Sequence, residues 1–338
     1  MKPELRIVLV SDGKPGHYHL SDGICAAIAR RRPVAVTRVE IMRPWWMPAR
    51  ALSAMTNAGG AAGRLAARVL GLDARPIPAC DLVVSAGGDT LAANIALART
   101  YSSRNIFYGS LRRYRPDDFA LVLTSYAANA NRPNHTMALK PSAFDPDTLP
   151  PRAPTAGLRP TLGLLIGGDS GTVRYHRTDW ERLLGLLPAL SPQSPRWVVS
   201  SSRRTPDDVS DAIAALAADA PGDIRFIDAR RKDSGTLMDL FAASQAVAVT
   251  VDSSSMVSEA IWARRPVVAL APETAALPAL EQGYRDYLAT RGWISTLPLK
   301  EATPDALLTR LEAVRPLTTN PLDALADLIA ARLPALYV

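Results

Sequence analysis

Residues 246–270 constrain the fold more than any other part of this sequence. The segment reads AVAVTVDSSSMVSEAIWARRPVVAL and starts with a β-branched run at residues 246–251, which is typical of a buried parallel strand. The run stops at Asp252 and three serines, a helical pattern covers residues 256–263, and a second apolar run ends the segment. This order predicts a strand, a polar turn, a helix and a strand. In such a unit the turn lies at the carboxyl edge of the sheet, where ligands bind and helix N–H groups favour an anion.

The same alternation runs along the whole chain. Strands are predicted at residues 6–10, 34–41, 81–85, 105–108, 120–124, 136–139, 161–166, 196–200, 224–227, 246–251 and 267–270. Helices are predicted at residues 20–30, 49–70 with a break at 59–60, 90–99, 178–187, 207–218, 236–243, 256–263, 277–289, 304–314 and 322–333. Strands that alternate with helices imply parallel sheets with right-handed crossovers.

The length of 338 residues exceeds one ordinary core and suits two domains. Six prolines between residues 141 and 160 indicate a linker. We therefore expect an α/β protein with two doubly wound, Rossmann-like domains that face each other across a cleft. The expected parts are an N-terminal domain at residues 1–145, a linker at 146–160, a C-terminal domain at 161–320, and a helix within 321–338 that packs back on the N-terminal domain.

Composition narrows the class of protein. Hydrophobic residues make up 48% of the chain, which predicts a globular protein, and no apolar run approaches the roughly 20 residues of a membrane span. The N-terminal residues lack the features of a signal peptide, so we expect a cytoplasmic protein. Cys25 and Cys80 suggest buried thiols in a reducing compartment. The formal charge of +7 favours anionic partners, but no nucleic-acid-binding motif occurs, so nucleic acid ranks below nucleotide phosphates and an anionic membrane surface.

Three loops of the C-terminal half follow predicted strands and carry residue types that bind phosphate. Glycines admit a close backbone approach, serines donate hydrogen bonds, and arginines make forked contacts to a diphosphate. The candidates are Gly168, Asp169, Ser170 and Gly171; Ser202, Arg203 and Arg204; and Asp252, Ser253, Ser254, Ser255 and Met256. Each loop has a structural alternative, namely a tight turn for the glycines, helix capping for the serines and a solvated turn for the arginines. Glu259 suits a sugar diol, or else lies on a solvated helix face or in a structural ion pair.

Two loops of the N-terminal half also follow predicted strands. The first contains Asp12, Lys14, Gly16 and His17, and the second contains Gly87, Gly88 and Asp89. Histidine can act as a general base near neutral pH, and an aspartate can act as a base or orient a partner. The alternatives are a local cap or a solvated residue for His17, and a tight turn with Asp89 as the helix N-cap. No histidine pair has the spacing of a zinc helix and no P-loop motif occurs, so we predict no metal site and no cofactor.

The segment RPWWMP at residues 43–48 is unusual because two adjacent tryptophans are costly to expose. One interpretation is a loop tucked into the domain. The other is an apolar rim, flanked by Arg43, that docks on a membrane or grips a lipid-linked acceptor.

Four segments together resemble a known family. They are DGKPGH at residues 12–17, GLLIGGDSG at 163–171, SSRRTP at 201–206 and VTVDSSSMVSEA at 249–260. The chain resembles the family named for mitochondrial fission and the elongated-mitochondria phenotype of plants, whose bacterial members are described as glycosyltransferases. The resemblance implies the GT-B architecture, with the nucleotide sugar bound by the C-terminal domain. It also implies that Ser253, Ser254, Ser255 and the loop at 168–171 hold the diphosphate, that Glu259 holds the ribose, and that His17 or Asp12 is the catalytic base.

The leading hypothesis is therefore a metal-independent transfer of sugar from a nucleotide-diphosphate sugar, which is a co-substrate, to an acceptor. By the resemblance, the acceptor is a cell-envelope glycan or glycolipid at the inner face of the inner membrane. One alternative is a nucleotide-sugar epimerase of the same fold. Another is a non-catalytic scaffold in membrane or organelle division, whose cellular role would survive Glu259→Ala.

Overall fold

The structure is a computed structural model that describes residues 3–151, 159–171, 173–188 and 194–337. The chain forms two compact units, which we call the first unit (Met1–Phe144 and Pro321–Val338) and the second unit (Asp145–Asn320). The predicted linker at 146–160 lies partly outside the described residues. Its described part bonds to the second unit, since Arg264 Nη2 donates to the carbonyl of Pro146 at 3.3 Å and Arg265 Nη2 to that of Pro150 at 3.0 Å.

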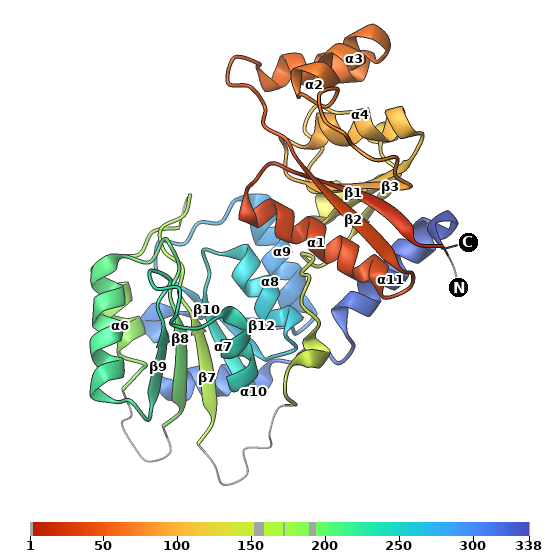
Figure 1. Cartoon of the computed structure of the whole chain (residues 1–338). Coiled ribbons are helices and arrows are strands. Elements are labelled where there is room, and N and C mark those ends of the chain that lie inside the picture. Colours follow the sequence, from red (N-terminus) through yellow and green to blue (C-terminus); the bar gives the residue numbers. More distant parts are fainter. Residues whose placement is uncertain (1–2, 152–158, 172, 189–193, 338) are drawn as a thin grey trace. The chain divides into compact units, whose positions relative to one another are not determined.

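The first unit contains a six-stranded parallel sheet in the order β2-β1-β3-β4-β5-β6 (Figure 1). Its strands are β1 (Leu5–Ser11), β2 (Val34–Glu40), β3 (Leu82–Ala86), β4 (Arg104–Tyr108), β5 (Leu121–Thr124) and β6 (His135–Met137). Its helices are α1 (Pro15–Ala29), α2 (Ala49–Ala58), α3 (Gly60–Val69), α4 (Leu91–Tyr101) and α11 (Pro321–Arg332). The short 3-10 helices are η1 (Pro116–Asp118), η2 (Ala127–Asn129) and η5 (Pro334–Leu336).

Both faces of the first sheet are apolar, as expected for parallel strands covered on two sides. One face packs Val8, Val83 and Phe107 against residues of α2, α3 and α4. On the other face α1 lies against β1 and β3, and α11 packs on α1, where Arg30 forms an ion pair with Asp323 at 2.7 Å. The C-terminal helix thus belongs to the first unit, although it follows the second unit in the sequence.

The second unit contains another six-stranded parallel sheet, in the order β12-β11-β10-β7-β8-β9. Its strands are β7 (Thr161–Leu165), β8 (Arg196–Ser200), β9 (Ile224–Ile227), β10 (Ala246–Thr250), β11 (Val267–Ala271) and β12 (Ile294–Pro298). Its helices are α5 (Arg177–Leu184), α6 (Asp207–Asp219), α7 (Leu237–Ala243), α8 (Ser254–Trp262), α9 (Ala279–Thr290) and α10 (Pro304–Ala313), with the 3-10 helices η3 (Pro146–Thr148) and η4 (Leu299–Glu301).

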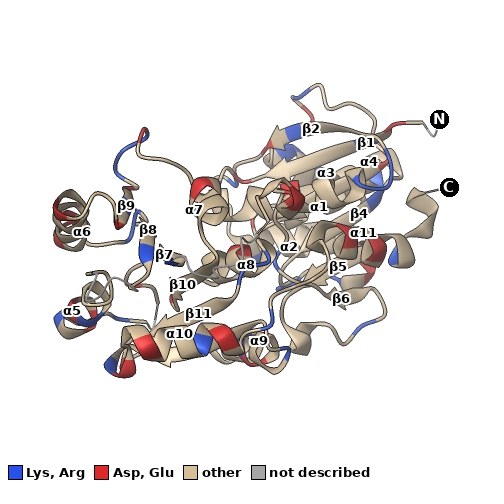
Figure 2. Ribbon diagram, turned by 90° about the horizontal axis from the view of Figure 1, so that it is seen from below, with Lys and Arg blue, Asp and Glu red and all other residues tan. Residues whose placement is uncertain are grey.

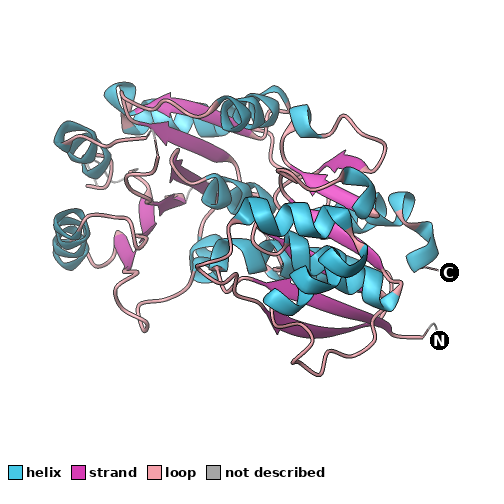
Figure 3. Ribbon diagram, turned by 90° about the horizontal axis from the view of Figure 1, so that it is seen from above, coloured by secondary structure: helices cyan, strands magenta, loops and turns pink. Residues whose placement is uncertain are grey.

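The core of the second unit follows the two-residue alternation of its strands. Leu164, Val199 and Ala248 pack with residues of α5, α6 and α10 on one face, and α7 and α8 contact the other. Charged residues mark the outer sides of α6 and α10 (Figure 2), and the strands lie between layers of helices in both units (Figure 3). The prediction of an α/β protein with two doubly wound, Rossmann-like domains is confirmed.

Two local predictions were wrong. Strand β12 was not predicted, because Ile294–Pro298 is an edge strand whose polar residues and proline hide the apolar pattern. α1 begins at Pro15 rather than near Leu20, since proline at the first helical turn carries a preset φ and needs no N–H partner. His17 therefore lies in the first turn of α1. Cys25 and Cys80 are buried free thiols, as predicted.

The strand orders place one topological switch point in each unit. In the first sheet the chain passes from β1 outward to β2 and then returns to β3 on the other side of β1. In the second sheet it passes from β7 to β8 and β9 and then returns to β10, the other neighbour of β7. Ligands of open α/β sheets bind beside the carboxyl ends of the strands at such points. The loops after β1 and β3, and those after β7 and β10, are therefore the places to look for a site.

Candidate functional site

At the first switch point an aspartate holds a histidine. Asp12 Oδ2 lies 2.8 Å from Nδ1 of His17, and the Asp12 side chain is only 4% exposed. Gly87, at the end of β3, has φ +92, and a Cβ there would lie 2.2 Å from the same nitrogen. A glycine is thus required both by the backbone and by the ring beside it. The arrangement orients the ring and leaves Nε2 as its other nitrogen for proton transfer.

Lys14 joins the two loops of this switch point. Its Nζ lies 3.3 Å from Asp12 Oδ2 and 2.8 Å from Asp89 Oδ2, and Arg43 Nε lies 3.4 Å from the other Asp89 oxygen. The hydrogen bond from Lys14 lowers the pKa of Asp89, and the same bond raises the pKa of Lys14. The alternative of Asp89 as an N-cap is wrong, because Thr90 is the residue that precedes α4.

Gly88 and Gly16, the two remaining predicted residues of this region, differ in the space around their Cβ positions. A Cβ on Gly88 would lie 2.3 Å from Cζ of Arg112, so the guanidinium group lies against the glycine backbone. A Cβ on Gly16 would meet nothing within 4 Å, so no close contact requires a glycine there. The structure thus brings Asp12, Lys14, His17 and the Gly87–Asp89 loop together, whereas the Cβ position of Gly16 faces open space.

At the second switch point Asp252 is the centre of the hydrogen bonds. Its side chain is fully buried and accepts from the N–H of Gly168 at 3.2 Å, from the Tyr175 hydroxyl at 3.0 Å and from Nη2 of Arg204 at 2.6 Å. A Cβ on Gly167 would lie 2.1 Å from the carboxylate. Burial and the nearby carboxylate raise the pKa of Tyr175, which keeps its hydroxyl a donor. Asp252 therefore ties three loops together rather than facing a ligand.

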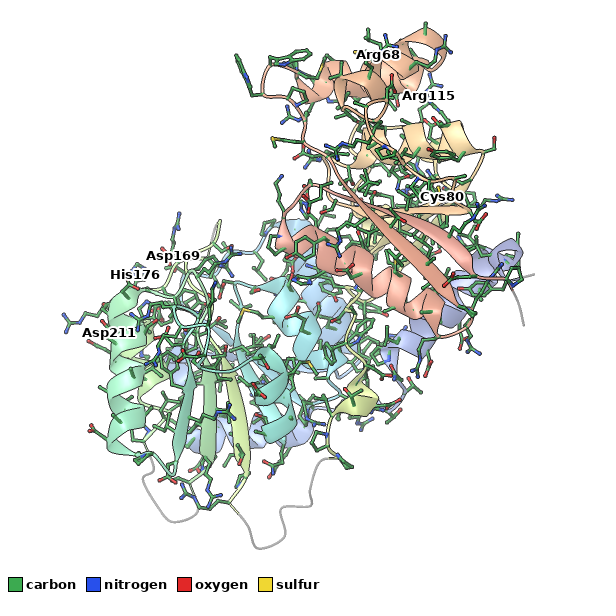
Figure 4. The ribbon with its side chains drawn as sticks, in the orientation of Figure 1. Arg68, Cys80, Arg115, Asp169, His176 and Asp211 are labelled. Carbon is green, nitrogen blue, oxygen red and sulfur yellow. The ribbon has the colours of Figure 1, made fainter. Side chains whose placement is uncertain are left out.

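The loop after β7 closes on itself. Asp169 Oδ1 accepts from the N–H of Tyr175 at 3.0 Å, and Ser170 and Val173 exchange backbone hydrogen bonds across a tight turn that includes Gly171 at φ +54. Asp169 also pairs with Arg174 at 3.3 Å. Figure 4 shows Asp169 and His176 at the same end of the second sheet. These contacts shape the loop and use the N–H groups of Gly168 and Ser170, so the N–H groups of Asp169 and Gly171 remain to meet a phosphate.

The loop after β8 packs under the glycine loop. The hydroxyl of Thr205 lies 2.8 Å from the carbonyl oxygen of Gly167 and accepts from the N–H of Ser202 at 2.9 Å. A Cβ on Gly168 would lie 2.0 Å from the carbonyl oxygen of Arg204, so only glycine fits there. Arg204 uses Nη2 to pair with Asp252, and its side chain is 38% exposed, so its predicted contact with a diphosphate stays a prediction. Arg203 is exposed and has no ion pair within the described part of the chain.

The start of α8 combines a cap and an exposed turn. Ser253 Oγ accepts from the N–H of Met256 at 3.3 Å, so the capping alternative is correct for Ser253. Ser254 and Ser255 are the first two residues of the helix, and Ser255 is exposed. The first N–H groups of a helix have no intrahelical partner and favour an anion.

Glu259 lies further along α8 and differs from the other carboxylates. Its side chain is partly buried, and burial raises its pKa from 4.5 to about 7. Among residues 3–151, 159–171, 173–188 and 194–337, none forms a hydrogen bond or an ion pair with its carboxylate. The alternative of a structural ion pair is thus wrong for the described chain, whereas the alternative of a solvated helix face stays open for this partly exposed side chain. A partly buried carboxylate without a partner is unfavourable unless a ligand supplies hydrogen bonds.

Several residues that organise these sites were not predicted. Tyr175 and Thr250 hold the glycine loop, the latter by accepting from the N–H of Gly167 at 2.7 Å. Arg112 has φ +54, which is uncommon for a residue other than glycine. In the sequence, the position of Thr250 at the end of an apolar strand was the one available signal.

Within the described ranges, no group of three or more His, Cys, Asp or Glu side chains is arranged to hold a metal ion. No described helix combines the length and the apolar character that crossing a bilayer requires.

Comparisons with known proteins agree with this fold. The structure is similar to MurG from Acinetobacter baumannii (TM-score 0.54, 15% identity, covering 97% of this chain and 100% of MurG) and to the glycotransferase of kitacinnamycin (0.54, 12%, 100% and 96%). It is also similar to a structure described as the putative UDP-N-acetylglucosamine 2-epimerase from Listeria monocytogenes (0.56, 11%, 98% and 97%). The fold is thus GT-B-like. No curated protein matches the sequence. The model of the family described as mitochondrial fission ELM1 matches residues 15–333, and the chain therefore belongs to that family.

Proposed function

We propose that this protein transfers a sugar from a nucleotide-diphosphate sugar to an acceptor. The second unit would hold the donor and the first unit would activate the acceptor. The observation that carries the proposal is Glu259, a partly buried carboxylate with a raised pKa and no partner among the described residues, on the helix that starts at a switch point. A carboxylate can accept two hydrogen bonds from the vicinal hydroxyls of a ribose.

The same loops would also bind the diphosphate of the donor. The N–H groups of Asp169 and Gly171, which have no acceptor among the described residues, and the first turn of α8 would donate to a diphosphate, and the exposed Arg203 would add a guanidinium group. The pairing of Arg204 with Asp252 removes a negative charge that would otherwise repel the diphosphate. These groups would stabilise the departing nucleoside diphosphate without a metal ion.

The first unit supplies a base. In the proposed reaction His17 accepts the proton of an acceptor hydroxyl, the hydroxyl oxygen forms a bond to C1 of the sugar, and the bond from C1 to the diphosphate breaks. Asp12, 2.8 Å from Nδ1, would orient the ring and stabilise the imidazolium. His17 is 35% exposed, so a substrate can reach the ring.

The acceptor is proposed to be a cell-envelope glycan or glycolipid, met by a cytoplasmic protein at the inner face of the membrane. The tucked-in interpretation of residues 43–48 is wrong, because Trp45 is 93% exposed, Trp46 56% and Met42 82%. Residues 41–72 also contain four arginines and no acidic residue. Exposed tryptophan beside arginine is typical of surfaces that lie in a membrane interface.

The test is calorimetric titration of the full chain with a panel of nucleoside diphosphates. One of them should bind, and Glu259→Gln should weaken its affinity by about tenfold or more, since a charged acceptor is lost. Glu312→Gln, an exposed glutamate on α10, is the matched control and should change nothing. Failure of every nucleoside diphosphate to bind, or equal loss in both variants, would refute the proposal.

Product analysis distinguishes the proposed transferase from the epimerase alternative. With the nucleotide sugar alone, a transferase leaves the sugar configuration of the unreacted donor unchanged, whereas an epimerase yields a second nucleotide sugar. The similarity to an epimerase structure makes this the necessary companion experiment.

A further inference from the structure

A small cavity of about 170 Å³ lies beside the switch point of the first unit. Its lining includes Arg43, Arg50, Asp89, Arg112, Arg113 and Tyr114. Pockets that hold drug-sized ligands measure about 300–1,000 Å³, so this cavity suits one small group of a larger molecule. Four arginines around so small a space point to an anionic group.

The charges of the cavity do not cancel within the protein. Asp89 is its one acidic lining residue, and Lys14 and Arg43 both contact it. Among the described residues none forms an ion pair with Arg50, Arg112 or Arg113. All three side chains are exposed, and their like charges around one cavity create a positive potential that attracts an anion.

The geometry also favours a small oxyanion. The backbone of Arg112 has φ +54, a strained conformation for this residue, and its guanidinium group lies against Gly88. The Tyr114 ring is buried, and burial raises its pKa to about 12, so the hydroxyl remains a donor at neutral pH. A forked guanidinium and a hydroxyl donor match the oxygens of a phosphate group.

A larger cavity of about 560 Å³ between α3 and α4 does not share this character. It also contains arginines, but Arg68 pairs with Asp73 at 3.2 Å, and Arg99 pairs with Asp118, which lies outside the lining. Excess positive charge is therefore smaller there.

We propose that the 170 Å³ cavity binds a phosphate or diphosphate group of the acceptor. That the ligand is an acceptor rests on the proposed function; that it is a phosphate rests on the cavity alone. The loop at residues 41–48 brings Arg43 to the cavity and exposes Trp45 and Trp46. Lipid-linked phosphate and free phosphate share the chemistry that this site recognises, and the experiment separates them.

The test titrates the full chain with inorganic diphosphate and with geranyl diphosphate, a short prenyl diphosphate. A saturating nucleoside diphosphate is present so that any site on the second unit is occupied. Arg112→Gln and Arg113→Gln should each weaken binding by about tenfold. Arg115→Gln removes the same charge from the same loop but lies outside the cavity lining, and should leave the affinity within twofold. Tighter binding of geranyl diphosphate identifies a lipid-borne phosphate, and equal binding identifies phosphate recognition alone.

Two results overturn the inference. One is the absence of binding by either diphosphate at millimolar concentration, and the other is equal weakening by Arg115→Gln, which would indicate only the general positive field. The nucleoside diphosphate titration is run separately on the same variants. If it fails while Arg112-dependent binding persists, the proposed function falls and this site stands; if it succeeds while that binding is absent, the site falls alone.

Discussion

The two switch points of this molecule are built from similar elements but handle charge in different ways. In the first unit, Asp12, Lys14, His17 and Asp89 contact one another, so each charge has a partner within the cluster. In the second unit, Asp252 forms an ion pair with Arg204 and accepts a hydrogen bond from the backbone of Gly168. Glu259, on the adjacent helix, has no partner among the described residues. The charged side chains of the first cluster pair with one another. Glu259 in the second unit has no such side-chain partner among the described residues.

This difference separates two chemical roles. A closed cluster fixes the position of a histidine and can pass a proton without rearrangement, which suits acid–base chemistry. An unpartnered, partly desolvated carboxylate has a free energy cost that a ligand can remove, which suits binding. The comparison therefore predicts that substitutions in the first unit change turnover, and substitutions in the second unit change donor affinity.

The largest expected effect is that of His17→Ala on turnover. Loss of a general base lowers kcat by about 10²–10⁴-fold, while the affinity for the nucleoside diphosphate should stay unchanged. Turnover is measured as nucleoside diphosphate released from the donor in the presence of a cell-envelope glycolipid fraction. His19→Ala, an exposed histidine on the same helix, is the control. Equal loss in both variants, or a weakened donor affinity in His17→Ala, would break the comparison.

A second prediction uses the raised pKa of Glu259. The ordinary pKa is 4.5 and the folded value is about 7, so between these values the folded protein binds more protons than the unfolded chain. Stability should therefore fall as the pH rises from about 4.5 through about 7, by roughly 3 kcal/mol in all. Glu259→Gln should abolish this pH-dependent fall in the unfolding free energy, because glutamine does not titrate.

Chemical denaturation at several pH values measures the effect. The variant should match the parent near pH 4 and exceed it in unfolding free energy at pH 8. Glu312→Gln, on the exposed side of α10, is the control. Its unfolding free energy should differ from that of the parent by the same amount at pH 4 and at pH 8. A Glu259→Gln difference that does not grow with pH would mean that the carboxylate has a partner in solution.

Matched glycines test the packing of the two switch loops. A Cβ on Gly168 meets a backbone carbonyl at 2.0 Å, whereas a Cβ on Gly88 meets the movable end of Arg112 at 2.3 Å. Gly168→Ala should lower the unfolding free energy by about 1–3 kcal/mol or more, because the backbone must shift. Gly88→Ala should cost less than about 1 kcal/mol, because Arg112 can swing away. Thermal and urea unfolding of the two variants measure the contrast, and equal losses would contradict it.

The positions of the switch loops could be predicted from the sequence, because each follows an apolar run that ends in glycine, serine or a charged residue. The functions of individual side chains within them could not. Asp252 and Tyr175 are 77 positions apart and meet only because β10 lies beside β7, a pairing that no local pattern encodes. Arg112 reaches Gly88 for the same reason, from a loop after β4. The lack of a partner at Glu259 is likewise a property of the packed surroundings.

The smallest expected effect concerns Trp45, on the loop between β2 and α2. Its side chain is 93% exposed, so Trp45→Ser should change the unfolding free energy by less than about 0.5 kcal/mol. Binding to phosphatidylglycerol-containing vesicles, measured by flotation, should nevertheless weaken by about tenfold, since an interfacial tryptophan buries a large apolar surface. Leu280→Ser, an exposed apolar residue on α9 of the second unit, is the control. If the membrane surface belongs to the first unit, only Trp45→Ser loses binding; if both variants lose it equally, attachment is not confined to the unit that holds the proposed base.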